Sequence, residues 1–161
     1  MKSVTYPFSP KSTRSLAPGQ FWAVPLPDGR FGCGRVITLQ LKENGTIDLR
    51  MFLAGLLDWV GAEPPTIESI AGRRTLEQGG AHIKTILATG GSILGHRPLT
   101  ADGIEPGLFL SQSPGKGCML QRGFEILHPA TASEQTELRT LQTWGYMVIQ
   151  RMAEKHFRTA A

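Results

Sequence analysis

The stretch from residue 19 to residue 41 reads GQFWAVPLPDGRFGCGRVITLQL, and it decides the fold class of this chain. Two runs of strand-forming residues meet at residues 27–30, where Asp-Gly supplies the residue types that tight hairpin turns favour. A third run, residues 47–57, follows a second turn at Asn44-Gly45. The chain therefore opens with a predicted three-stranded antiparallel meander.

Two glycines, Gly32 and Gly34, stand inside the second predicted strand. Glycine within a strand weakens it, and it usually marks strong bending or the close approach of another backbone. Two such glycines fit the coiled strand of a small barrel, so we expect the meander to be partly barrel-like. Strand alternation places Arg35 on the same face as Cys33 and Ile37.

Composition and length indicate one globular domain. The chain has 161 residues, of which 40% are hydrophobic and 19% charged, and it contains 19 Gly and 11 Pro. This balance suits many short strands and turns better than a helix bundle. We predict a flexible N-terminal arm over residues 1–18 and a single domain over residues 19–161. The sequence shows no apolar run of spanning length and no signal-peptide core, so we expect a cytoplasmic protein without membrane contact.

The formal net charge of +4 lies mostly at the N-terminus. Residues 1–20 carry Lys2, Lys11 and Arg14 without an acid, whereas residues 21–132 hold ten basic and ten acidic side chains. Proteins that bind nucleic acid usually gather basic charge along one face or helix. The balanced body therefore argues against nucleic acid as a partner.

The middle of the chain gives weaker patterns. Residues 81–88 fit either a strand or a short helix, and residues 92–99 fit a short edge strand. Two more strands are predicted at residues 107–110 and 118–127, on either side of a Pro- and Gly-rich turn.

The end of the chain reads as a helix. Thr131 and Glu134 match a capping box, and apolar residues then follow at helical spacing. We predict a docked helix of roughly six to seven turns from there. The predicted fold class is α+β: a strongly bent antiparallel sheet, partly barrel-like at its N-terminal meander, packed by this long C-terminal helix.

Known catalytic and ligand-binding patterns do not fit this sequence. It matches no phosphate-binding loop, no nucleophile elbow and no metal-ligand spacing, so we expect no cofactor and no enzymatic activity. Cys33 would need a nearby base to act as a nucleophile, and only His96 could supply one through folding. Cys33 and Cys118 could pair, but lone cysteines without a secretion signal are more often reduced.

The opening hairpin resembles a known family. Residues 19–36, GQFWAVPLPDGRFGCGRV, are similar to the first hairpin of the immunity protein 26 family of bacterial polymorphic toxin systems. A second similarity covers residues 89–99, TGGSILGHRPL, although Ser92 and Ile93 stand where that family usually has Trp-Pro. The resemblance implies a non-enzymatic protein that binds a cognate toxin and blocks it stoichiometrically.

Arginine and aromatic side chains near turns are the candidates for contact with such a toxin, because these residue types dominate protein interfaces. Five residues meet this description: Trp59, Arg73, Arg74, His96 and Arg97. The sequence does not indicate an oligomeric state.

Two other classes of function stay open. The first is a small-barrel module for nucleic acid or peptide, with Phe21, Trp22 and Phe31 as a stacking surface and the basic arm on phosphates. The second is a hydrolase or transferase whose site forms only on folding, around Cys33 or His96.

Overall fold

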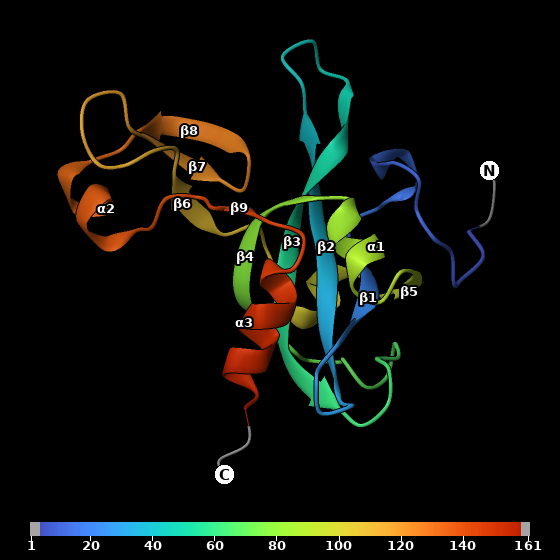
Figure 1. Ribbon diagram of the computed structural model, residues 1–161. Helices are drawn as coiled ribbons and strands as arrows, with labels where there is room; N and C mark the ends of the chain where they lie inside the picture. The colour runs from blue at the N-terminus through green and yellow to red at the C-terminus, as the bar shows by residue number, and fades with distance from the viewer. Residues whose placement is uncertain (1–3, 159–161) are drawn as a thin grey trace.

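The computed structural model describes residues 4–158, which form two antiparallel-rich sheets with short helices (Figure 1). The larger sheet has six strands in the order β5-β1-β2-β3-β4-β9. All its neighbouring strands are antiparallel except β4 and β9, which are parallel. Its strands are β1 (Gln20–Pro25), β2 (Phe31–Leu41), β3 (Ile47–Gly61), β4 (Thr75–His82), β5 (Ile93–His96) and β9 (Thr143–Trp144).

The smaller sheet is antiparallel and has the order β6-β7-β8. Its strands are β6 (Leu108–Leu110), β7 (Met119–Arg122) and β8 (Glu125–Pro129). The helices are α1 (Lys84–Ala88), α2 (Ala132–Glu137) and α3 (Val148–His156), with short 3₁₀ turns η1 (Thr13–Ser15) and η2 (Leu99–Asp102). Figure 1 shows the smaller sheet and α2 set to one side of the larger sheet.

The predicted three-stranded meander is confirmed as β1, β2 and β3, with both expected turns in place. Alternation along β1 puts Trp22 and Val24 in one core cluster and Phe21 in the other, on the two faces of the sheet. The first cluster is covered by α1 and α3, and the second by segments near Ile70 and Ile104.

The barrel-like prediction is wrong. Within residues 4–158 the larger sheet stays open, with β5 and β9 at its two ends. The glycines of β2 serve packing instead of barrel closure: Gly34 lies under the Trp22 indole, and a Cβ at Gly32 would lie 3.4 Å from the Ala153 Cβ of α3.

The prediction of a long C-terminal helix is also wrong. Among residues 4–158, α3 is the only helix of seven or more residues. The capping box does form, and it starts the six-residue α2. The chain then extends because the carbonyl of Arg139 accepts the Leu110 amide and the carbonyl of Gln142 accepts the Gly80 amide. These backbone hydrogen bonds stabilise the extended chain more than the helix that the spacing of the apolar residues favours.

Residues 4–18, the described part of the predicted arm, lie against the larger sheet. Phe8 and Ile93 exchange backbone hydrogen bonds at 3.1 and 2.8 Å, and Leu16 is buried in the core. The Thr13 hydroxyl donates to the carbonyl of Asp48. The mobility and the domain boundary expected at residue 18 stay predictions.

Candidate functional site

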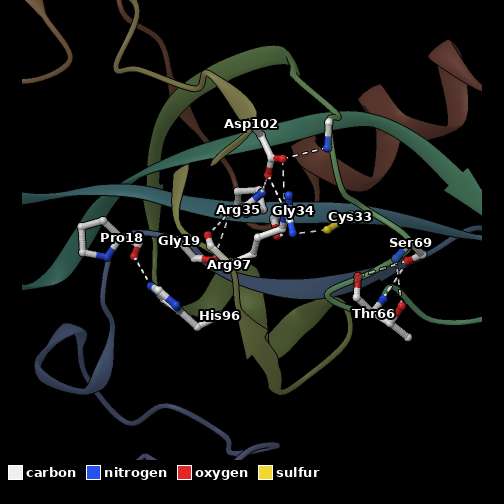
Figure 2. A network of polar contacts seen from close by, with 11 residues as sticks. Pro18, Gly19, Cys33, Gly34, Arg35, Thr66, Ser69, His96, Arg97 and Asp102 are labelled. Carbon is white, nitrogen blue, oxygen red and sulfur yellow. Dashed lines mark hydrogen bonds and ion pairs between the residues drawn. The ribbon is translucent and has the colours of Figure 1, made fainter. Parts of the chain in front are cut away.

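A buried ionic network centred on Asp102 joins segments that are far apart in the sequence (Figure 2). Its carboxylate accepts the Arg97 Nε–H, at 3.0 Å to Oδ1 and 2.9 Å to Oδ2. It also accepts the Gly72 amide at 2.7 Å and the Arg35 guanidinium at 3.4 Å. The side chains of Arg35 and Asp102 are both fully buried, so each charge is compensated inside the protein.

Arg35 also ties the network to the start of β1. Its Nη2 donates to the carbonyl of Gly19 at 3.2 Å and to the carbonyl of Arg97. Gly19 has a φ of +98°, and an added Cβ would lie 2.7 Å from the Arg97 carbonyl oxygen, so this junction requires glycine. The Arg35 Nε has no hydrogen-bond partner among the described residues.

The pKa shifts follow from burial and from these partners. Burial alone would raise the pKa of Asp102, but hydrogen bonds from Arg97 and the Gly72 amide outweigh it and hold that pKa below its usual value. Burial lowers the pKa of Arg35, while Asp102 opposes that change. The hydrogen bond to Asp102 raises the pKa of Arg97. The network is therefore a charged structural clamp at neutral pH, and we call it the Asp102 clamp.

Two of the predicted contact residues lie in or beside the Asp102 clamp. Arg97 is a member of it, with 22% of its side chain exposed. His96 points the other way, and its Nε2 lies 2.9 Å from the carbonyl oxygen of Pro18. The Arg97 Nε donates to Asp102 and so helps to hold the fold, while the contact role expected of Arg97 stays a prediction.

The other three predicted residues lie next to the Asp102 clamp. Trp59 is 8% exposed and packs in the second core cluster. Arg73 and Arg74 are exposed and follow Gly72, whose amide the clamp holds. The Arg74 carbonyl accepts the Asp58 amide at 2.8 Å, which places these two arginines beside Trp59 on β3. The structure therefore brings Arg73, Arg74 and Arg97 to one corner of the molecule.

The loop that leads to Arg73 is fixed by its own hydrogen bonds. Thr66 and Ser69 bond reciprocally, since each backbone amide donates to the other side chain, at 2.8 and 3.0 Å (Figure 2). The Arg73 amide then donates to the Ile70 carbonyl at 3.1 Å. With Asp102 holding Gly72, the backbone before the two arginines is anchored at both ends, so it presents them in a defined place.

The structure buries Phe21, Trp22 and Cys33, three of the residues on which the two alternative functions depend. Phe21 and Trp22 are 1% and 0% exposed, so they cannot stack on bases. Cys33 is fully buried, and burial raises the pKa of its thiol far above neutral, which disfavours the nucleophilic thiolate. Cys33 and Cys118 are both free thiols.

Sequence reasoning missed Arg35 and Asp102 as a pair. The signal for Arg35 was present, because strand alternation placed its charge on an apolar face with Cys33 and Ile37, and a buried charge needs a partner. Asp102 gave no such signal, because an Asp-Gly pair reads as an ordinary surface turn.

Residues 4–158 contain neither a metal-ligand cluster nor a membrane-spanning helix. No three His, Cys, Asp or Glu side chains in this part of the chain gather closely enough to hold a metal ion. None of its helices combines the length and apolar character needed to cross a bilayer.

The family model for immunity protein 26 matches residues 17–115, which is more than half of the chain. The chain belongs to the immunity protein 26 family. All members of the Asp102 clamp lie inside the matched residues, whereas β7, β8, β9, α2 and α3 lie beyond them. No curated protein and no solved structure matches the chain.

Membership in this family implies neutralisation of a cognate toxin from a polymorphic toxin system. Proteins of this family are typically non-enzymatic. The Asp102 clamp joins one carboxylate to two arginines and holds the Gly72 loop in place.

Proposed function

We propose that this protein neutralises its cognate toxin by direct, stoichiometric binding in the bacterial cytoplasm, without catalysis or a cofactor. Family membership over residues 17–115 is the observation that carries the proposal. A blocker needs a surface that complements the toxin and does not need reactive side chains.

Arg73 and Arg74 are the contact residues that the geometry favours among the five candidates. Both are exposed, and the Asp102 clamp fixes the backbone before them. A fixed backbone reduces the entropy that binding costs, and arginine is enriched at the centre of interfaces. Trp59, His96 and Arg97 then support this surface from beneath and beside it.

The test is co-purification with the toxin domain encoded by the neighbouring gene. The tagged protein should retain that domain in a complex of fixed stoichiometry at low and high salt, and should restore growth of cells that express it. The R73E/R74E double variant should weaken the complex about 10-fold or more, because both interface charges are reversed.

Arg14→Glu with Lys42→Glu is the matched control, since it makes the same charge change at two other exposed positions. This control should bind as the unchanged protein does. Absence of a complex, with nucleic acid retained instead and released by salt, would reject direct toxin binding and favour a nucleic-acid-binding module.

A further inference from the structure

A groove of about 530 Å³ lies beside β4, at the edge of the larger sheet. Its lining comes from four places: Glu77 and Gln78 of β4, Phe109 of β6, residues 139–140 with 142–144, and one side of α3. The groove does not include any of the five contact residues predicted from the sequence.

The edge of β4 that lines the groove is unpaired. On its inner side β4 is paired with β3 from Thr75 to His82, but on its outer side it is paired with β9 only at Gly80 and Ala81. No strand within residues 4–158 covers the outer edge before Gly80. Such an edge offers N–H and C=O groups to an added strand.

Positive charge dominates the groove. Its charged lining comprises Arg139, Lys155, His156 and one acid, Glu77. Arg139 is 75% exposed and donates to Glu77 at 3.0 Å, which leaves most of its five N–H donors free. Lys155 forms no ion pair within residues 4–158. The two permanent cations exceed the single acid, so the groove attracts negative charge.

Apolar side chains lie beside these cations. Trp144, Val148, Met152 and Phe109 line the same groove. The Trp144 indole lies directly over Gly79, where an added Cβ would overlap it, so the aromatic ring sits against the backbone of the unpaired strand. The groove thus offers main-chain hydrogen bonds, apolar contact and positive charge in one place.

The groove spans the boundary of the family match. β4 and Phe109 lie within residues 17–115, whereas Arg139, Trp144 and Lys155 lie beyond them. The strand edge therefore belongs to the part of the chain that defines the family, and the cations come from the part that does not. This division suits recognition of one particular toxin.

We propose that this groove receives an extended, acidic segment of the cognate toxin, which adds as a strand beside β4 and places its carboxylates on Arg139 and Lys155. The proposal rests on the proposed function and names the part of the toxin that is recognised. Strand addition supplies affinity through the backbone, and charge complementarity supplies the choice of partner.

The test measures binding of the toxin domain encoded by the neighbouring gene to charge variants of the full chain. R139E/K155E should raise the dissociation constant by about 10- to 100-fold, and this loss of affinity should be smaller at high salt. Glu77→Gln should leave the affinity equal or raise it severalfold, because it removes the one acid among the described residues that line the groove. R14E/K42E is the control with the same net charge change.

Hydrogen exchange on the complex locates the segment. Of residues 75–79, the amides that point away from β3 should become protected on binding, since these would pair with the added strand. A complex that forms with unchanged affinity in R139E/K155E and without protection of β4 would overturn the groove proposal and leave toxin binding intact. Absence of any complex with the unchanged protein would overturn both.

Self-association through the groove is the other outcome that would decide which molecule occupies it. Light scattering on the isolated protein would show a dimer if a second copy occupied the groove. A dimer that R139E/K155E dissociates would assign the groove to that copy and overturn the toxin segment as its occupant.

Discussion

The Arg35 side chain is fully buried on β2, and the Asp102 carboxylate balances its charge. Removing one partner of a buried pair costs more than the pair contributes, because it leaves an uncompensated charge in the interior. Asp102 also holds the Gly72 amide at 2.7 Å, so one carboxylate fixes both a strand and a loop.

Asp102→Asn should lower the free energy of unfolding by about 3–5 kcal/mol, because it strands the Arg35 charge. Urea unfolding at neutral pH measures this loss. Glu137→Gln is the control, an exposed acid on α2 whose replacement should change stability by less than about 0.5 kcal/mol. Equal losses of stability in the two variants would contradict the inference that Asp102 stabilises the fold by balancing the buried Arg35 charge.

The same carboxylate predicts a pH dependence. Its pKa is lower in the folded protein than in the unfolded chain, where an aspartate titrates near pH 4. Its stabilisation is therefore present above about pH 4 and is lost as the pH falls through the folded pKa. Urea unfolding from about pH 7 to pH 3 should show the stability gap between the unchanged protein and D102N narrowing in acid. A constant gap would refute this linkage.

The glycines of β2 provide a second prediction for single residues. Gly34→Ala should destabilise the protein by about 1–3 kcal/mol or more, because the new Cβ overlaps the buried Trp22 indole. Gly32→Ala is its matched control on the same strand, where the Cβ meets Ala153 at 3.4 Å, an ordinary contact. Thermal unfolding of the two variants should place G34A well below G32A.

At the scale of elements, the sequence patterns correctly predicted the elements that depend on interactions between neighbouring residues. The meander and the start of α2 followed from Asp-Gly, Asn-Gly and the capping box, whose effects act within a few residues. Both misjudged features depended on distant partners. The helix after α2 was interrupted by backbone bonds to Leu110 and Gly80, and the bend expected of β2 was instead room for Trp22.

The candidate site also combines features that the sequence predicts with features that depend on contacts between distant residues. The sequence singled out Arg73, Arg74 and Arg97, which the fold does bring to one corner. It could not reveal that Asp102 would bind the Arg97 Nε, because that contact requires the chain to be folded. The groove beside β4 was equally hidden, since no pattern predicted β4 as a strand.

The interrupted helix leads to a prediction about α3. Ile149 is fully buried on α3, whereas Arg151 is exposed. Ile149→Ala should cost about 2–5 kcal/mol of stability, because it leaves a cavity between α3 and the sheet. Arg151→Ala should stay within about 0.5 kcal/mol. Chemical unfolding compares them, and a similar small loss in both would mean that α3 does not seal the core.

At the scale of the whole molecule, burial is uneven between the two sheets. The strands of the larger sheet supply most residues of both core clusters, whereas every residue of β8 is exposed. Ile126 is 58% exposed there. Regions with few buried apolar contacts open at lower free energy than the core.

Native-state hydrogen exchange should therefore separate the two sheets. Amides of β7 and β8 are expected to exchange faster than those of β2 and β3, because opening the smaller sheet exposes less apolar surface. Uniform protection across both sheets would show that they open as one cooperative unit.

Because α3 covers the first core cluster, this cluster can be closed only after α3 has been synthesised. Ile149 and Ala153 of α3 close that cluster, and α3 follows every strand of the larger sheet in the sequence. A growing chain that contains every strand of the larger sheet but not yet α3 therefore still exposes the apolar face of this cluster to water. A chain truncated shortly before α3 would therefore keep an exposed apolar face, which chaperones and proteases recognise as unfinished folding.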